Sequence, residues 1–216
     1  MSPGRIGAVL AQKAVQLGAE LVRDDVQEMN RQDQSWKIVG KLATYRSDKV
    51  VLSMGAWSPT LLKPLGIKVP LMVERGYHVQ YPAAGIEVHN SVMDVDTKVV
   101  ASAMSAGVRV AGQAEFAPID APPDPKRKTI LSHVAKGIFP DLNQSTETFW
   151  MGRRPSFPDS LPVLGSVPDQ EGLFVNFGHS HYGLLMAPKS AEIVAAAVTN
   201  APVNEDLSNM ALQRFL

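Results

Sequence analysis

Residues 150–165 contain two adjacent arginines, Arg153 and Arg154, in a proline-rich and otherwise apolar stretch. Prolines restrict the backbone, so the Cα atom that carries an arginine side chain in this stretch has a restricted position. A rigidly held guanidinium can form two parallel hydrogen bonds to a carboxylate. The stretch therefore predicts a carboxylate-binding arginine, and a surface ion pair with Asp159 is the alternative.

Residues 178–188 form a second stretch, in which Gly178 and Gly183 bracket His179 and His181 just before an expected helix. The free N–H groups at a helix N-terminus favour anions and developing negative charge. A metal site would need a third ligand, and the sequence supplies none nearby. We expect an anion-stabilising loop; a polar loop with one hydrogen-bonded histidine is the alternative.

Residues 50–59 form a third stretch, a short apolar run that reaches Gly55 and leads into a helix beginning at Ser58 and Pro59. A short apolar run that ends at glycine is typical of a strand buried on both faces. A glycine at the strand end lets a ligand approach the backbone. An ordinary strand–turn–helix without a ligand is the alternative.

The hydrophobic periodicity predicts the elements that must position these stretches. An apolar stripe at helical spacing marks residues 4–17, and the helix that follows the two histidines carries Pro188 inside it. Helices and strands of both kinds make α+β, or mixed α/β, the expected fold class. Beyond the three stretches, we expect helices at 4–17, 128–139 and 183–199 and strands at 20–23, 36–39, 42–45, 69–82, 92–95, 98–104, 108–111, 149–151 and 173–176.

The composition excludes several classes of protein. Of 216 residues 45% are hydrophobic, Lys plus Arg and Asp plus Glu both number 21, and cysteine is absent. These values argue against disorder, against nucleic acid as the main partner, and against disulfides or thiolate metal sites. No apolar run is long enough for a membrane span, and the N-terminus lacks a signal peptide, so we expect a cytoplasmic protein. The complete fingerprints of dinucleotide sites, P-loops, zinc proteases and serine hydrolases are also absent.

Five stretches, taken in order, resemble the C-terminal half of the FAD-dependent amino-acid oxidoreductases of the D-amino-acid oxidase superfamily. The nearest branch is that of D-amino-acid dehydrogenase and glycine oxidase. The resemblance implies a partial FAD-binding domain at 1–66, an antiparallel substrate-binding domain at 67–150, and a return to the FAD-binding domain at 151–216. The stretches that carry the resemblance are residues 51–66, 73–78, 108–116, 152–165 and 178–188.

The resemblance also implies roles for single residues. Arg154 would bind the substrate carboxylate, and His181 and Tyr77 would face the substrate; a packing role is the alternative for Tyr77. The reaction would be oxidative deamination of a D-amino acid or a related small amine acid, with FAD as cofactor, no metal and no required side-chain base. Its second electron acceptor, oxygen or a quinone-linked chain, is left open. A core packing role is the alternative for Val26. Residues expected to contact FAD are Val26, Gly55, His179, Ser180, His181, Tyr182, Gly183, Leu184 and Leu185.

One departure from the family pattern bears on what the chain can do alone. Family members begin with a strand and a glycine-rich segment that holds the ADP part of FAD, and this sequence has no such segment. We therefore expect weak or absent FAD binding by the chain alone, and either self-association or a partner that supplies the FAD-binding half. A non-catalytic remnant or subunit that binds carboxylates is the alternative function.

Overall fold

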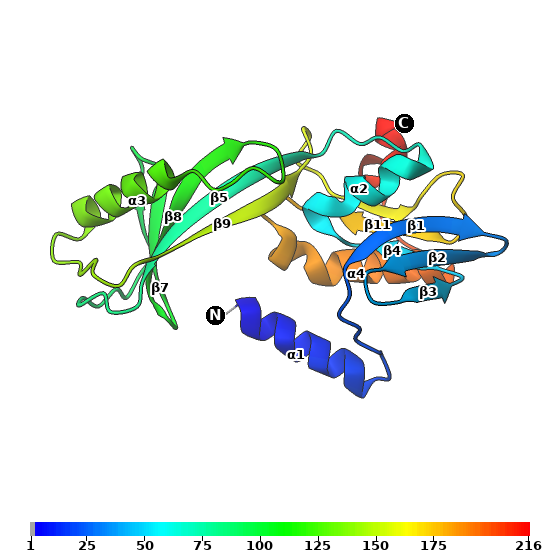
Figure 1. Cartoon of the computed structure of the whole chain (residues 1–216), viewed down its shortest axis with the longest axis horizontal. Coiled ribbons are helices and arrows are strands. Elements are labelled where there is room, and N and C mark those ends of the chain that lie inside the picture. The colour runs from blue at the N-terminus through cyan, green and yellow to red at the C-terminus, as the bar shows by residue number, and fades with distance from the viewer. Residues whose placement is uncertain (1–2) are drawn as a thin grey trace. The chain divides into compact units, whose positions relative to one another are not determined.

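The computed structural model describes residues 3–216, which divide into two units (Figure 1). The antiparallel unit contains the residues up to Lys13 together with Glu74–Arg153. The mixed-sheet unit contains Ala14–Val73 and Arg154–Leu216. The chain thus passes between the units at 13/14, at 73/74 and at 153/154. The three-part domain division at 66/67 and 150/151 stays a prediction.

A three-stranded sheet forms the centre of the mixed-sheet unit. Its order is β10 (Val163–Ser166), β11 (Leu173–Phe177), β4 (Val50–Leu52), and β11 pairs antiparallel with β10 but parallel with β4. All of β4 and most of β11 is apolar, a pattern typical of strands covered on both faces. Most of β11 is buried, but Val51 of β4 is exposed. One face carries α4 (Gly183–Thr199), through a core of Leu164, Phe174, Ile193 and Val194.

The other face of this sheet is covered by an antiparallel meander of β1 (Val26–Gln32), β2 (Ser35–Gly40) and β3 (Thr44–Ser47). Met29 and Trp36 from the meander are buried in one core with Leu173 and Val175 of β11. After β4 the chain forms η1 (Gly55–Trp57), α2 (Ser58–Leu62) and η2 (Lys63–Leu65), and its last turns are η3 (Ser208–Met210) and η4 (Leu212–Phe215).

The antiparallel unit is a five-stranded sheet with one helix on it. The strand order is β6 (Val92–Asp94), β7 (Val99–Met104), β8 (Gly107–Phe116), β5 (Met72–Tyr81), β9 (Thr148–Ser156). The helix α3 (Pro125–Ile138) is capped by Asp124, whose side chain accepts a hydrogen bond from the amide of Lys126. Alternate residues of β5, β7 and β8 form the core under α3: Tyr77, Val79, Tyr81, Val99, Ala101, Val108 and Val110 pack with Leu131 and Ala135.

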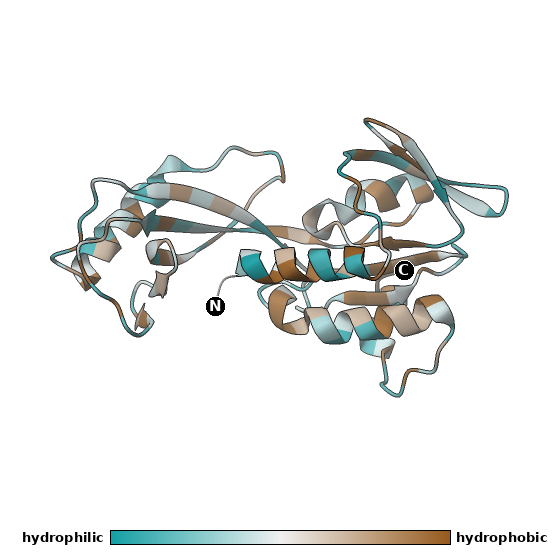
Figure 2. Ribbon diagram, turned by 90° about the horizontal axis from the view of Figure 1, so that it is seen from below, coloured by the Kyte–Doolittle hydropathy of each residue, from teal (hydrophilic) through white to brown (hydrophobic). Residues whose placement is uncertain are grey.

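Two N-terminal segments bury less than their sequence suggests. The helix α1 (Pro3–Gln16) forms as predicted, with apolar and polar bands along it in Figure 2, but none of its described side chains is buried. The strand predicted at 20–23 is wrong: residues 19–25 form no strand, and Leu21 and Val22 are exposed. A strand needs a neighbour to hydrogen-bond, and no strand among residues 3–216 pairs with this segment. No helix in this described part is long and apolar enough to cross a membrane.

Candidate functional site

The carboxyl ends of two parallel strands meet at one edge of the mixed sheet. The register of β4 and β11 aligns Leu52 with Val175, so Gly55 and Gly178 follow the strands at the same edge. Both glycines adopt positive φ, +55° and +88°. Ligands of open α/β sheets bind where parallel strands end, and glycine lets the backbone turn sharply there. This edge is therefore the candidate site.

The arginine stretch is joined to the histidine loop at this edge. The amide of Ser180 donates to the carbonyl oxygen of Pro155 at 3.0 Å, and Ser156 forms an isolated β-bridge with His179. The hydroxyl of Ser156 also donates to that of Ser180 at 3.0 Å. Arg154 directly precedes Pro155, so two predicted functional segments, 26 residues apart between Arg154 and Ser180, lie side by side.

His179 is anchored to the helix that follows the loop. Its Nε2 lies 3.0 Å from the hydroxyl oxygen of Ser190, within hydrogen-bonding distance. Burial lowers the pKa of His179 below its ordinary value, so the ring is neutral at neutral pH. Ser190 is itself buried in α4. The side chain of His179 therefore orients the loop, in agreement with the alternative of a polar loop with one hydrogen-bonded histidine. Its contact with FAD stays a prediction.

The N-terminus of α4 is open to solvent and to ligands. Tyr182 occupies the N-cap position without a capping side-chain hydrogen bond, and the first turn holds no acidic residue. Tyr182, Leu184 and Leu185 are exposed, Leu185 by 80%. Backbone N–H groups and exposed apolar side chains therefore occur together. This combination suits a flat ligand that carries or develops negative charge at one edge.

A cavity of about 540 Å³ lies near Gly55. Val26, at the start of β1, lines it together with Met54 and Trp57. Val26 and the residue before Gly55 are thus brought to one cavity by the packing of the meander against η1 and α2. The lining residues are Asp25, Val26, Gln27, Met54, Trp57, Thr60 and Leu61.

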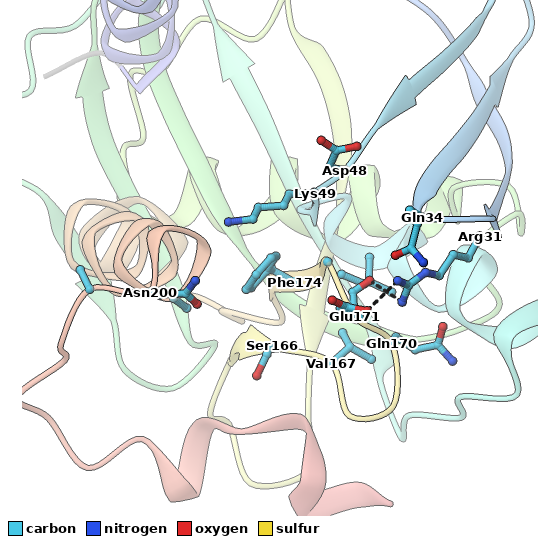
Figure 3. Close-up of a pocket in the computed structure, with 14 residues that line it drawn as sticks. Arg31, Gln34, Asp48, Lys49, Ser166, Val167, Gln170, Glu171, Phe174 and Asn200 are labelled. Carbon is cyan, nitrogen blue, oxygen red and sulfur yellow. Dashed lines mark hydrogen bonds and ion pairs between the residues drawn. The ribbon is translucent and has the colours of Figure 1, made fainter.

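A second and larger cavity, of about 750 Å³, opens at the opposite edge of the sheet (Figure 3). It is lined by Asp48 and Lys49, which precede β4, and by Arg31, which pairs with Glu171 at 2.7 Å. Cations and anions are mixed here, and none of the residues predicted to bind substrate or cofactor lines it. Because it lies at the amino ends of the parallel strands, we do not assign it to the candidate site.

Tyr77 lies in the core of the antiparallel unit and is only 2% exposed. Its hydroxyl donates to Glu115 Oε2 and accepts from Arg75 Nη2 at 3.0 Å, and its ring stacks on Phe149 with centroids 5.6 Å apart. This arrangement favours the packing role that was the alternative for Tyr77. Its contact with substrate stays a prediction and would require the hydroxyl to leave these partners.

Other polar groups of the antiparallel unit were missed by the sequence reasoning. Arg75 is buried and pairs with Glu115, its cross-strand partner in the β5–β8 register. His78 stacks on the exposed ring of Trp150 with centroids 5.0 Å apart, and burial and the charge of Arg109 lower its pKa to about 4. The signal for Arg75 lay in the alternation of β5, which gives it the same two-residue spacing as the buried Tyr77, Val79 and Tyr81.

The ion pair considered for the arginine stretch forms with a different arginine. Asp159 accepts from Arg214, with Nε 2.8 Å from Oδ2. Arg153 instead donates its Nε to the carbonyl oxygen of Ile119 at 2.7 Å. Successive residues of a strand point to opposite faces, so Arg154 projects from the other face of β9.

Among residues 3–216 no three His, Asp or Glu side chains gather into a metal-binding group.

Comparison with known proteins identifies relatives over almost the whole chain. The model of the family described as "FAD dependent oxidoreductase" matches residues 1–197. The chain is 32% identical to a D-amino-acid oxidase of Bradyrhizobium diazoefficiens, over 99% of this chain and 52% of that protein. It is 31% identical to a D-amino acid dehydrogenase of Vibrio atlanticus, over 96% of this chain and 51% of that protein.

Solved structures agree with this. Glycine oxidase from Geobacillus kaustophilus superposes with a TM-score of 0.81 at 25% identity, covering 97% of this chain and 57% of that one. Iminodiacetate oxidase from Chelativorans shares the fold, with a TM-score of 0.78 at 22% identity over 95% of this chain and 57% of that one. The chain spans about half the length of the curated relatives it matches.

Proposed function

Since the chain belongs to the family of FAD-dependent oxidoreductases, we propose that it forms the substrate-binding and flavin-facing part of an enzyme that oxidises a D-amino acid or a related small amine acid. One observation carries the proposal. The segment that follows Arg154 is hydrogen-bonded to the 178–183 loop, at the edge of the sheet where parallel strands end. The backbone beside Arg154, which would bind the carboxylate, and the loop that would favour anions therefore lie together.

Arg154 would hold the substrate carboxylate. Pro155 limits the backbone beside it, and the bond from Ser180 to the carbonyl of Pro155 ties that backbone to the loop. A guanidinium on a restricted backbone can orient a carboxylate through two hydrogen bonds. The carboxylate then fixes the position of the adjacent Cα of an amino acid. His181, in the same loop, would face the substrate beside it.

FAD fits the residues that remain. The uncapped N-terminus of α4 offers N–H groups to the edge of the flavin where charge develops, and exposed Leu184 and Leu185 offer apolar contacts. Gly55 keeps backbone accessible beside the cavity lined by Val26. Bound FAD would supply the acceptor for the Cα hydride, and the substrate imine would hydrolyse to a keto acid and ammonia.

A partner that supplies the FAD-binding half is part of the proposal. β4 is an edge strand among the described residues although its sequence suits a strand covered on both sides, and Val51 in it is exposed. Leu21 and Val22 are exposed, and α1 buries no described side chain. The open edge of β4 fits a polypeptide that adds a strand beside it. Self-association through the same surfaces is the competing outcome.

Reconstitution tests this proposal. The chain would be mixed with the part of the Bradyrhizobium diazoefficiens relative that it does not span, in the presence of FAD. We expect a yellow complex that reduces an artificial electron acceptor with D-alanine but not with L-alanine, and weak or no flavin binding by the chain alone. A mixture that binds no flavin and shows no dye reduction dependent on D-alanine would contradict the proposal. We also propose a cytoplasmic location, which fractionation of expressing cells would test.

A further inference from the structure

The end of the chain is tied to the arginine stretch by one guanidinium. Arg214 Nε donates to Asp159 Oδ2 at 2.8 Å, and Nη2 donates to Asp159 Oδ1 at 3.4 Å and to the carbonyl oxygen of Leu161 at 2.7 Å. Nη1 donates to the carbonyl oxygen of Ala211 at 3.2 Å. Leu212, in the same turn, is fully buried in the core of the mixed-sheet unit. The C-terminal turn η4 is therefore a fixed element of that unit.

Phe157 is held between this turn and the central sheet. Its ring stacks on Phe215 with centroids 4.8 Å apart and lies 5.8 Å from the ring of Phe177 in β11. The guanidinium carbon of Arg214 lies 4.2 Å from the Phe215 centroid and 5.4 Å from that of Phe157. Phe157 is only 3% exposed. A ring enclosed in this way has little freedom to move unless the C-terminal turn η4 moves with it.

Phe157 in turn shapes the start of the histidine loop. A Cβ built on Gly178 would lie 2.2 Å from Cε2 of Phe157, so the ring fills the space beside this glycine. Gly178 has φ of +88°, and the next residue, His179, bridges to Ser156. The course of the backbone from β11 into the loop thus depends on where the Phe157 ring lies.

We propose that Arg214 and Phe215 are positioning residues for the 178–183 loop. They clamp Phe157, the Phe157 ring sets the turn at Gly178, and that turn delivers Ser180 to the carbonyl of Pro155. Neither residue needs to touch a ligand in this scheme. What the loop binds rests on the proposed function, whereas the loop's dependence on the tail does not.

Amide hydrogen exchange at Ser180 tests the clamp directly. In Arg214→Gln the side chain can no longer reach Asp159 and Leu161 together, and we expect Ser180 to exchange about tenfold faster or more. Arg31→Gln is the matched control: Arg31 likewise donates to a carboxylate, Glu171, and to a backbone carbonyl, at the opposite edge of the same unit (Figure 3). Even if Arg31→Gln and Arg214→Gln lose the same free energy of unfolding, Arg31→Gln should leave the exchange rate of the Ser180 amide within about twofold of wild type.

Equal acceleration in both variants, or none in Arg214→Gln, would overturn the proposal. Should Arg214→Gln fail to fold, Phe215→Leu provides the same comparison, because it keeps the ion pair and removes only the ring stacked on Phe157. The expected acceleration is smaller but again specific to the 178–183 loop.

Flavin affinity in the reconstituted mixture separates positioning from a purely structural role. We expect Arg214→Gln to weaken it by about fivefold or more and Arg31→Gln to leave it unchanged. Faster Ser180 exchange with unchanged flavin affinity would refute the positioning role. Arg154→Ala distinguishes the two proposals: it should lower kcat/KM for D-alanine at least about tenfold without changing the exchange rate of the Ser180 amide. If kcat/KM for D-alanine is unchanged in that variant, only the carboxylate-binding role of Arg154 is refuted, and the positioning role of Arg214 and Phe215 is not.

Discussion

Replacing Arg154 gives the sharpest test of the candidate site, in the reconstituted mixture with FAD. Arg154→Ala removes both the charge and the fork, whereas Arg154→Lys keeps the charge and loses the planar pair of bonds. Hydrogen bonds to charged groups contribute about 1.5–3 kcal/mol each. Arg154 is partly exposed, so solvent screening favours the lower end of that range. One or two such bonds at about 1.5 kcal/mol each, at 1.4 kcal/mol per tenfold, give an expected loss of kcat/KM of about ten- to 150-fold for Arg154→Ala.

The assay is dye reduction with D-alanine, with flavin content measured by absorbance. Arg154→Lys should fall between wild type and Arg154→Ala, and flavin content should stay constant, because the guanidinium would bind substrate rather than cofactor. Arg153→Ala is the control, since Arg153 bonds to Ile119 and points from the opposite face of β9. Equal kinetic losses for Arg153→Ala and Arg154→Ala, or none for either, would refute this role of Arg154.

Further predictions concern stability and association. Burial and a nearby guanidinium lower the pKa of His78 from 6.5 to about 4, so the unfolded chain binds more protons between these pH values. With allowance for solvent screening of this partly exposed ring, the free energy of unfolding should fall by roughly 1–2 kcal/mol from pH 6.5 to pH 4. Denaturant titrations in which the free energy of unfolding of His78→Gln depends on pH as steeply as that of wild type would contradict this. Gly178→Ala should lower the Tm, because its Cβ meets the ring of Phe157, whereas Gly137→Ala meets no atom within 4 Å and should raise the Tm slightly. Leu10→Glu, on the exposed face of α1, should reduce self-association, which a sizing column measures. If the wild type elutes as an oligomer and the variant elutes at the same volume, that face does not mediate the association.

Local patterns were sufficient where an element is specified by its own residues. The helix predicted over 183–199 matches α4, with Pro188 inside it. The strand predicted before Gly55 also forms as β4, but only Leu52 in it is buried and Val51 is exposed, so its predicted burial on both faces is wrong for the described residues. The predicted start of the middle helix, at Lys128, was late: Asp124 and Pro125 are a capping residue and a proline at the first helical position.

The tertiary structure alone decided which distant residues meet. The strand predicted at 20–23 does not form, because strand pairing depends on a neighbour that local sequence cannot specify. Asp159 lies five residues from Arg154 but pairs with Arg214 at the end of the chain.

By itself, the sequence was sufficient for the family, for naming the residues of the candidate site, and for the glycines that let its loops turn. Joining Arg154 to the loop near Ser180 required the parallel register of β4 and β11 and the bond from Ser180 to Pro155. Such contacts between distant residues are set by how the sheet, the meander and the helix pack together, so no local pattern encodes them.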